Sequence, residues 1–256
     1  MATIDLNCDL GESFGPYVIG NDEEMLKIIS SANVACGFHG GDPVVMHRTL
    51  ELAKENGVGV GAHPGFNDLW GFGRRQIHGQ SPADVEKMLI YQVGAVRGMA
   101  AAVGTVVTHY KLHGALGNMA CVDADLACAA ARAVKAIDPG LIFVVLPGSE
   151  LEKAGEKLGL RMAREIFADR AYDDEGMLVA RKLPGAMFYD PEIVGRRIVQ
   201  FVEEGMLESI SGKKLPVKID TICVHGDGPT AVDIARQVRK ALTEKNIEIK
   251  PMAEAL

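Results

Sequence analysis

The chain has 256 residues, of which 48% are hydrophobic and 24% are charged, enough to bury one large α/β core. Its formal net charge of −7, without a basic patch, argues against nucleic acid and anionic membranes as partners. The sequence has no signal-peptide pattern and no apolar run of about 18 residues, so we expect a soluble, cytoplasmic protein. Five cysteines without C-x-x-C spacing favour neither a disulfide framework nor a structural zinc site.

The first predicted strand covers residues 4–10. Hydrophobic residues alternate in it with Asp5, Asn7 and Asp9, so that one face is apolar and the other polar and acidic. Because an unpaired buried carboxylate is costly, the acidic face must meet water, a cation or a polar pocket. We therefore interpret this strand as one wall of an active site.

Strand and helix patterns alternate along the rest of the chain. Further strands are expected at residues 32–38, 58–62, 106–112, 141–146, 162–167 and 219–224. Capping residues and helix-starting prolines predict helix starts at Asn21, Asp42, Ser81, Asp123, Ser149, Asp190 and Pro229. Residues 66–80 form a long loop, of a kind that is usually functional inside a compact domain. Residues 172–184 look irregular, with a short hairpin expected near residues 174–176.

About seven strands alternating with helices predict a parallel sheet, and we expect one catalytic domain over residues 1–256. An open doubly wound sheet and a closed barrel both fit this order. Polar residues follow the carboxyl ends of five strands, and a barrel gathers such ends around one mouth, whereas an open sheet spreads them. These residues are His39, His63, His113, Asp169 and His225. Their positions favour the barrel.

Strand alternation also places ionisable side chains on shared faces. His109, Lys111 and His113 share one face, and Glu165 and Asp169 share another. The sequence therefore predicts one polar interior, whose candidate catalytic residues are Asp9, His39, His63, Lys111, His113, Asp169 and His225. A single histidine at a strand end is more often structural than catalytic, and we assign His47 and His78 to structure or to the surface.

Two further features leave alternatives open. Arg74 and Arg75 are either a solvated loop pair or a clamp for a carboxylate or phosphate. A metal site of the hydrolase kind could combine Asp9 with one or more histidines, namely His39, His63 and His225. The sequence has no G-x-x-x-x-G-K-[ST] phosphate loop, so nucleotide binding by this chain alone is unsupported. No G-x-S-x-G elbow is present either.

Six ordered motifs resemble those of the LamB/YcsF family, the family of the 5-oxoprolinase A subunit. They are DLNCDLGE at 5–12, SANVACGFH at 31–39, GAHPG at 61–65, GFGRR at 71–75, FADR at 167–170 and CVHGD at 223–227. The resemblance runs essentially from end to end. It implies a seven-stranded (β/α) barrel of the glycoside hydrolase/deacetylase type, in agreement with the strand count above.

The same resemblance implies an ATP-dependent 5-oxoprolinase, which cleaves the lactam of 5-oxoproline to give L-glutamate. ATP with Mg would be the cofactor, and 5-oxoprolinase subunits B and C would be the partners. Candidate substrate-binding residues are Asn7, Glu12, Arg74, Arg75, Asn118, Arg170 and Asp227. The family usually reads KPHGALYN where residues 111–118 read KLHGALGN, so that Leu112 and Gly117 replace a proline and a tyrosine.

In the expected mechanism, Asp9 or a nearby histidine is the general base, while Lys111 and His113 stabilise developing negative charge. Arg74 or Arg75 holds the carboxylate or a phosphate. Two alternatives remain. One is a free-standing metal-dependent amide hydrolase or deacetylase that needs no ATP, and the other is a non-catalytic scaffold for partner subunits.

Overall fold

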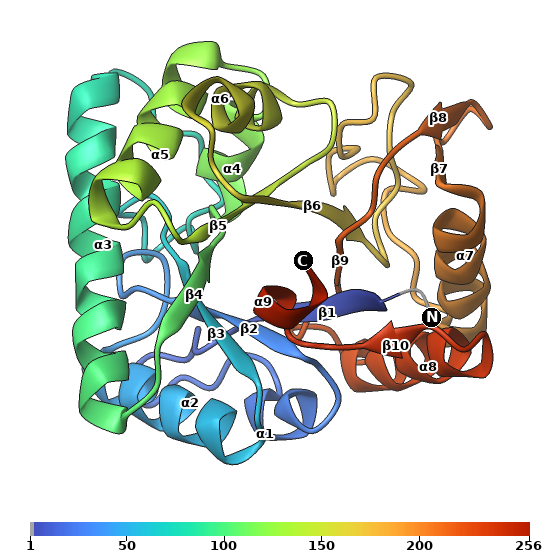
Figure 1. Cartoon of the computed structure of the whole chain (residues 1–256), viewed down its shortest axis with the longest axis horizontal. Helices are drawn as coiled ribbons and strands as arrows, with labels where there is room; N and C mark the ends of the chain where they lie inside the picture. Colours follow the sequence, from blue (N-terminus) through green and yellow to red (C-terminus); the bar gives the residue numbers. More distant parts are fainter. Residues whose placement is uncertain (1–2) are drawn as a thin grey trace.

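The computed structural model describes residues 3–256; Met1 and Ala2, where we expect no targeting segment, lie outside the described residues. Parallel strands form a closed ring with helices on the outside (Figure 1). In ring order they are β1 (Thr3–Leu10), β2 (Ser31–Ala35), β3 (Gly59–His63), β4 (Val107–Tyr110), β5 (Ile142–Val145), β6 (Met162–Phe167) and β9 (Thr221–Cys223). The ring closes because β9 pairs with β1, with Asp5 opposite Thr221. The predicted seven-stranded (β/α) barrel is therefore confirmed.

Helices cover the outside of the barrel. They are α1 (Asp22–Leu26), α2 (Pro43–Glu55), α3 (Pro82–Val103), α4 (Gly114–Ala120), α5 (Ala124–Ile137), α6 (Glu150–Leu158), α7 (Pro191–Glu204) and α8 (Ala231–Glu244). Most predicted N-caps are confirmed; the Asp42 carboxylate, for example, accepts hydrogen bonds from the N–H groups of Val44 and Val45. None of the helices within residues 3–256 is long and apolar enough to cross a membrane.

Several short elements were not predicted. They are α4, the antiparallel pair β7 (Met206–Glu208) and β8 (Lys214–Pro216), β10 (Glu248–Ile249) and α9 (Met252–Ala255). The second strand ends at Ala35 rather than at residue 38, because Gly37 adopts a φ of 90° and turns the chain. The hairpin expected near residues 174–176 is present as a bridge between Tyr172 and Leu178.

The two faces of β1 point into different layers. Leu6, Cys8 and Leu10 are buried in the hydrophobic core. Asp5 lies among buried hydroxyl groups, accepting hydrogen bonds from Ser31 at 2.6 Å and from Ser30 at 2.8 Å. Thus the apolar face packs in the core and the polar face meets polar groups of the neighbouring strands, as the alternation predicted.

The amino-terminal end of the barrel is closed by the end of the chain. Ile142, Val144 and Ala163 form a small apolar cluster with Met252 of α9. The N–H of Met252 also donates to Ser31 Oγ at 3.0 Å. In Figure 1, α9 lies over the centre of the ring. The opposite end, at the carboxyl ends of the strands, carries the candidate site.

Candidate active site

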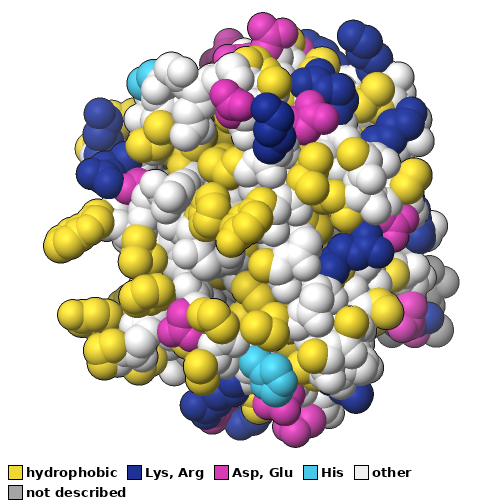
Figure 2. Space-filling view, turned by 90° about the vertical axis from the view of Figure 1, so that its left-hand side faces the viewer, with side chains coloured by type: hydrophobic (Ala, Val, Ile, Leu, Met, Phe, Trp, Pro, Cys, Tyr) yellow, Lys and Arg dark blue, Asp and Glu magenta, His cyan; other side chains and the backbone are white. Residues whose placement is uncertain are grey.

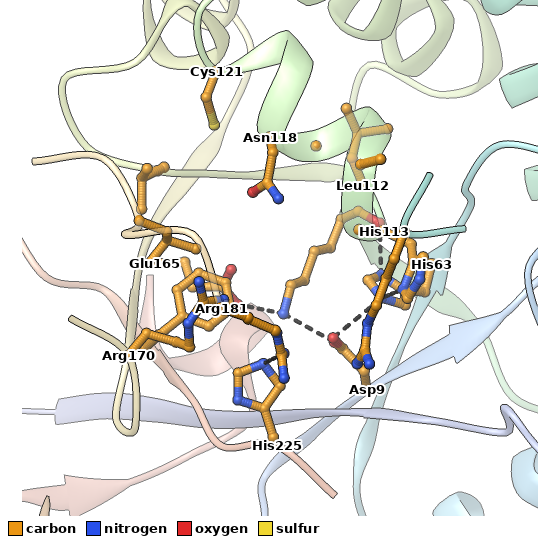
Figure 3. Close-up of a pocket in the computed structure, with 18 of the residues that line it drawn as sticks. Asp9, His63, Leu112, His113, Asn118, Cys121, Glu165, Arg170, Arg181 and His225 are labelled. Carbon is orange, nitrogen blue, oxygen red and sulfur yellow. Dashed lines mark hydrogen bonds and ion pairs between the residues drawn. The ribbon is translucent and has the colours of Figure 1, made fainter. Parts of the chain in front are cut away.

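A cavity of about 530 Å³ lies at the carboxyl ends of the strands. Its wall includes Asp9 of β1, His63 of β3, Lys111 after β4 and Glu165 of β6. His113, which like Lys111 follows β4, and His225, which follows β9, also line it. The structure therefore brings together side chains from distant parts of the sequence, as a barrel mouth was expected to do (Figure 3).

A buried cation lies between two carboxylates in this wall. Lys111 Nζ is 2.9 Å from Asp9 Oδ1 and 2.8 Å from Glu165 Oε1. Glu165 Oε1 has no hydrogen-bond partner among the described residues, so the contact between Glu165 and Lys111 is an ion pair without hydrogen-bond alignment. Burial opposes the charged form of Lys111, but Asp9 and other neighbours outweigh it and hold the pKa of Lys111 well above normal. Lys111 is therefore a fixed positive charge.

Asp9 is held as an anion by its surroundings. Burial works to raise its pKa, but His63 and Lys111 together hold the pKa of Asp9 well below its usual value of 3.8. His63 Nε2 is 3.2 Å from Asp9 Oδ2, and Asn33 donates to Oδ1 at 2.9 Å. For Glu165 the balance differs, since burial raises its pKa in spite of Lys111. The two carboxylates beside one lysine thus have opposite pKa shifts.

A cluster of one carboxylate and three histidines adjoins Asp9. Its members are Glu12, His39, His63 and His113, all buried, with one ligand atom each lying within 4.8 Å of the others. His63 Nε2 is 3.0 Å from His113 Nδ1, and the His39 ring stacks on the His113 ring at a centroid distance of 3.5 Å. Burial lowers the pKa of both His39 and His113 well below 6.5. Such a cluster could hold a metal ion.

Another part of the cavity wall carries His225 and two arginines. His225 Nδ1 lies 2.6 Å from Asp169 Oδ1, and its Nε2 accepts from Arg181 Nη2 at 2.7 Å. Arg170 donates from Nη2 to the carbonyl of Val179, while its buried Nε has no partner among the described residues. Burial is the main reason that the pKa of Arg170 falls to about 10, and the positive charge of Arg181 lowers it further. Both arginines line the same cavity as Lys111, and their positive charges favour an anionic ligand there.

Comparison with known proteins decides the family. The model of the LamB/YcsF family matches residues 4–256. The chain belongs to the LamB/YcsF family. Curated family relatives include the 5-oxoprolinase A subunit of Rhodopseudomonas palustris (strain BisB5), 53% identical over 98% of each chain. Another is the 5-oxoprolinase A subunit of Ruegeria pomeroyi, 54% identical over 97% of this chain and 98% of the relative.

Solved structures agree with this assignment. The lactam utilization protein from Thermus thermophilus is 46% identical and has a TM-score of 0.92, with 97% of this chain and 99% of that chain covered. A putative cellobiose-phosphate cleavage protein from Enterococcus faecalis V583 is 13% identical, with a TM-score of 0.57, and covers 99% of this chain and 98% of its own. The latter likeness shows a shared fold and nothing more.

The remaining LamB/YcsF motif residues divide between the cavity and its support. Arg74, Asn118 and Asp227 line the cavity, and Arg74 donates to Asp227 Oδ2 at 2.9 Å. Arg75 instead pairs with the buried carboxylate of Asp68. Asn7 is fully buried and donates to Thr221 Oγ1 at 2.7 Å.

The structure also separates candidates that the sequence had grouped. His225, one of the candidate metal ligands, lies with Asp169 and Arg181 rather than in the cluster around His63. Arg181, which lines the cavity, was not predicted at all. It lies in the irregular stretch 172–184, and the only signal for it was that this stretch follows the FADR motif. Leu112 and Gly117, where the chain departs from the family pattern, both line the cavity.

Proposed function

We propose that this chain is the subunit of an ATP-dependent 5-oxoprolinase that opens the lactam of 5-oxoproline to L-glutamate, together with subunits B and C. The observation that carries the proposal is the buried Lys111, held between Asp9 and Glu165 in a cavity of about 530 Å³. Small-molecule sites usually have volumes of about 300–1,000 Å³. The family relatives named as A subunits of 5-oxoprolinase support the choice of substrate.

The substrate carboxylate would pair with arginine. Arg170 and Arg181 line the cavity, and the buried Nε of Arg170 has no hydrogen-bond partner within residues 3–256. Guanidinium groups bind carboxylates in a bidentate manner with strong, charge-assisted hydrogen bonds. Since Arg75 pairs with Asp68, we assign this role to Arg170 and Arg181, with Arg74 near the mouth left for a phosphate.

The lactam is a stable amide, so its hydrolysis requires activation of the carbonyl. In the proposed reaction, the terminal phosphoryl group of ATP, bound with Mg²⁺, is transferred to the carbonyl oxygen, and ADP leaves. One water then adds to the carbonyl carbon, the ring C–N bond breaks, and the nitrogen leaves as the amine. A second water hydrolyses the resulting acyl phosphate to glutamate and phosphate. Lys111 stabilises negative charge near the carbonyl, and Asp9 accepts a proton from the attacking water.

The partner subunits would meet this chain around the cavity mouth. The segments that follow the carboxyl ends of β1, β2 and β3 carry highly exposed apolar side chains, namely Tyr17, Val18 and Trp70 in loops and Val44 at the start of α2. In Figure 2, hydrophobic side chains project from the left edge, which is the side of the barrel opposite α9. A partner seated there could deliver an activating phosphoryl group to the cavity.

The test of the proposal is a Lys111→Met variant in the reconstituted complex. We expect 5-oxoproline-dependent glutamate formation to fall by at least about 100-fold, because removal of one charge-stabilising group typically has this effect. Removing one partner of a buried ion pair also destabilises, so a Lys111→Met/Glu165→Gln double variant serves as the folding control. A stable double variant with wild-type activity would refute the role of Lys111.

A second candidate is a free-standing metal-dependent amide hydrolase or deacetylase. The buried cluster of Glu12 and three histidines is the observation that favours it. This alternative requires amide cleavage by the isolated chain without ATP. Release of acetate or amine from amide substrates by the chain alone would favour this metal-dependent hydrolase over the ATP-dependent 5-oxoprolinase.

A further inference from the structure

Three side chains of the cluster direct one ligand atom each towards a common point. His63 Nε2 lies 3.0 Å from His113 Nδ1, and His113 Nδ1 lies 3.4 Å from Glu12 Oε1. Metal bonds of about 2.0–2.1 Å in tetrahedral geometry place neighbouring ligand atoms roughly 3.3 Å apart. Both measured distances lie close to this value, so one ion could contact all three atoms with little movement of the side chains.

The two histidines also have the tautomers that ligation requires. His63 Nδ1 donates to the carbonyl of Lys111 at 2.9 Å, and His113 Nε2 donates to the carbonyl of Phe72 at 2.8 Å. These assignments follow from the hydrogen-bond partners, since a carbonyl can only accept. In neutral imidazoles these tautomers leave lone pairs on His63 Nε2 and His113 Nδ1, 3.0 Å apart, and a cation bound between them would stabilise both lone pairs and the neighbouring Asp9 carboxylate. Metal-binding histidines commonly donate their other N–H to a carbonyl in this way.

Glu12, His63 and His113 leave one side of the position where their ligand atoms meet open to the cavity. Glu12, His63 and His113 all line the cavity, and Figure 3 shows His63 and His113 beside Asp9. Three protein ligands with an open position are typical of catalytic zinc sites, whereas structural sites use four. His39 completes the support, because its Nε2 lies 3.1 Å from Glu12 Oε1 and its ring stacks on His113.

We propose that Glu12, His63 and His113 bind one divalent transition-metal ion, with its open coordination position facing the cavity beside Asp9, and that His39 is a positioning residue. Two imidazoles and one carboxylate suit Zn²⁺ or Co²⁺ better than Mg²⁺, which prefers oxygen ligands. When bound, such an ion would polarise the lactam carbonyl or acidify a water. That role rests on the proposed function, whereas metal binding itself does not.

The test is a titration of the chelator-treated full chain with Co²⁺. We expect one Co²⁺ per chain, with the visible absorption of a four- or five-coordinate ion, and displacement by one equivalent of Zn²⁺. His113→Ala and Glu12→Gln should weaken Co²⁺ binding by at least about 100-fold, and His39→Ala by about 10–100-fold as an outer-shell change. His47→Ala and His78→Ala, which lie outside the cluster, should bind as wild type.

Folding is checked on the metal-free variants by circular dichroism and thermal unfolding. Ions that bind only the folded chain should raise the unfolding temperature of wild type but not that of His113→Ala. Failure of wild type to bind Co²⁺ more tightly than His113→Ala would overturn the proposal. Binding by a wild-type chain whose complex shows no 5-oxoproline-dependent phosphate release would support the metal site and refute the proposed function instead.

Discussion

At the scale of single residues, the site depends on how neighbours set the charge of each group. Asp9 and Glu165 both contact Lys111, yet Asp9 also lies beside His63 and stays ionised, while burial dominates at Glu165. Lys111 therefore contacts one carboxylate that stays charged, Asp9, and one that is more easily protonated, Glu165. The Asp9 carboxylate is the group whose charge should matter most to the reaction.

We predict that Asp9→Asn lowers ATP-coupled glutamate formation in the complex by about 10²–10⁴-fold, because the amide cannot accept the proton. Since the amide of the variant does not ionise, raising the pH should not restore the rate. The loss should appear in kcat more than in KM. Asp233→Asn, on the exposed face of α8, is the matched control. An unchanged rate in Asp9→Asn would show that the base assignment is wrong.

Sequence patterns located many of the site residues but could not separate near neighbours. Residues at strand ends, such as His63 and Lys111, were predictable because alternation and the barrel mouth place them together. The distinction between Arg74 and Arg75 depends on Asp68, whose carboxylate is reached only through the folded loop. Arg181 lies outside the regular helices and strands, so no periodicity marks it.

At the scale of elements, local patterns identified the long helices and most strands, while the short elements depend on distant partners. β1 was predictable because its eight residues alternate clearly between apolar and polar. β10 has only two residues and exists through its pairing with Thr3 and Ile4 of β1. α4 contains two glycines in seven residues, which weakens any helix signal, and it packs against α5.

The buried polar face of β1 has a consequence for stability. Burial raises the pKa of Asp5 to about 6, from 3.8, although the hydroxyls of Ser31, Thr221 and Ser30 oppose the rise. The folded chain therefore keeps a proton that the unfolded chain releases. The stability from this proton is complete below pH 3.8 and is lost as the pH rises through about 6.

We predict that wild type loses about 1.5 kcal/mol more unfolding free energy between pH 5 and pH 8 than Asp5→Asn does, since the amide has no proton to release. Urea unfolding at both pH values measures this difference, and all other titrating groups are common to the two proteins. Asp233→Asn should keep the wild-type pH dependence. Parallel pH profiles for wild type and Asp5→Asn would contradict the predicted pKa shift.

At the scale of the whole molecule, the barrel has two different ends. The amino-terminal end is closed by α9, whereas the carboxyl ends of the strands hold the cavity and are surrounded by exposed apolar side chains. The closed barrel was predictable because its polar strand ends need one common mouth. The exposed apolar residues around that mouth could not be recognised from sequence, since apolar residues are more often buried.

We predict that Trp70→Ala weakens assembly with subunits B and C by at least about 30-fold, the effect expected of an aromatic interface anchor. The variant should fold as wild type, because Trp70 is 96% exposed. Val106, 70% exposed and preceding β4 at the opposite end of the barrel, provides the control variant Val106→Ala. Titration calorimetry with the partners compares the three proteins, and equal affinities for all of them would exclude this surface.

We propose that this cavity opens 5-oxoproline only when the assembled enzyme uses ATP. The measurement is 5-oxoproline-dependent release of phosphate and glutamate, first by the chain alone and then with subunits B and C added. We expect no turnover by the chain alone, and equal amounts of phosphate and glutamate from the complex. Lactam opening by the isolated chain, or glutamate formed without matching phosphate, would contradict this coupling of ring opening to ATP use.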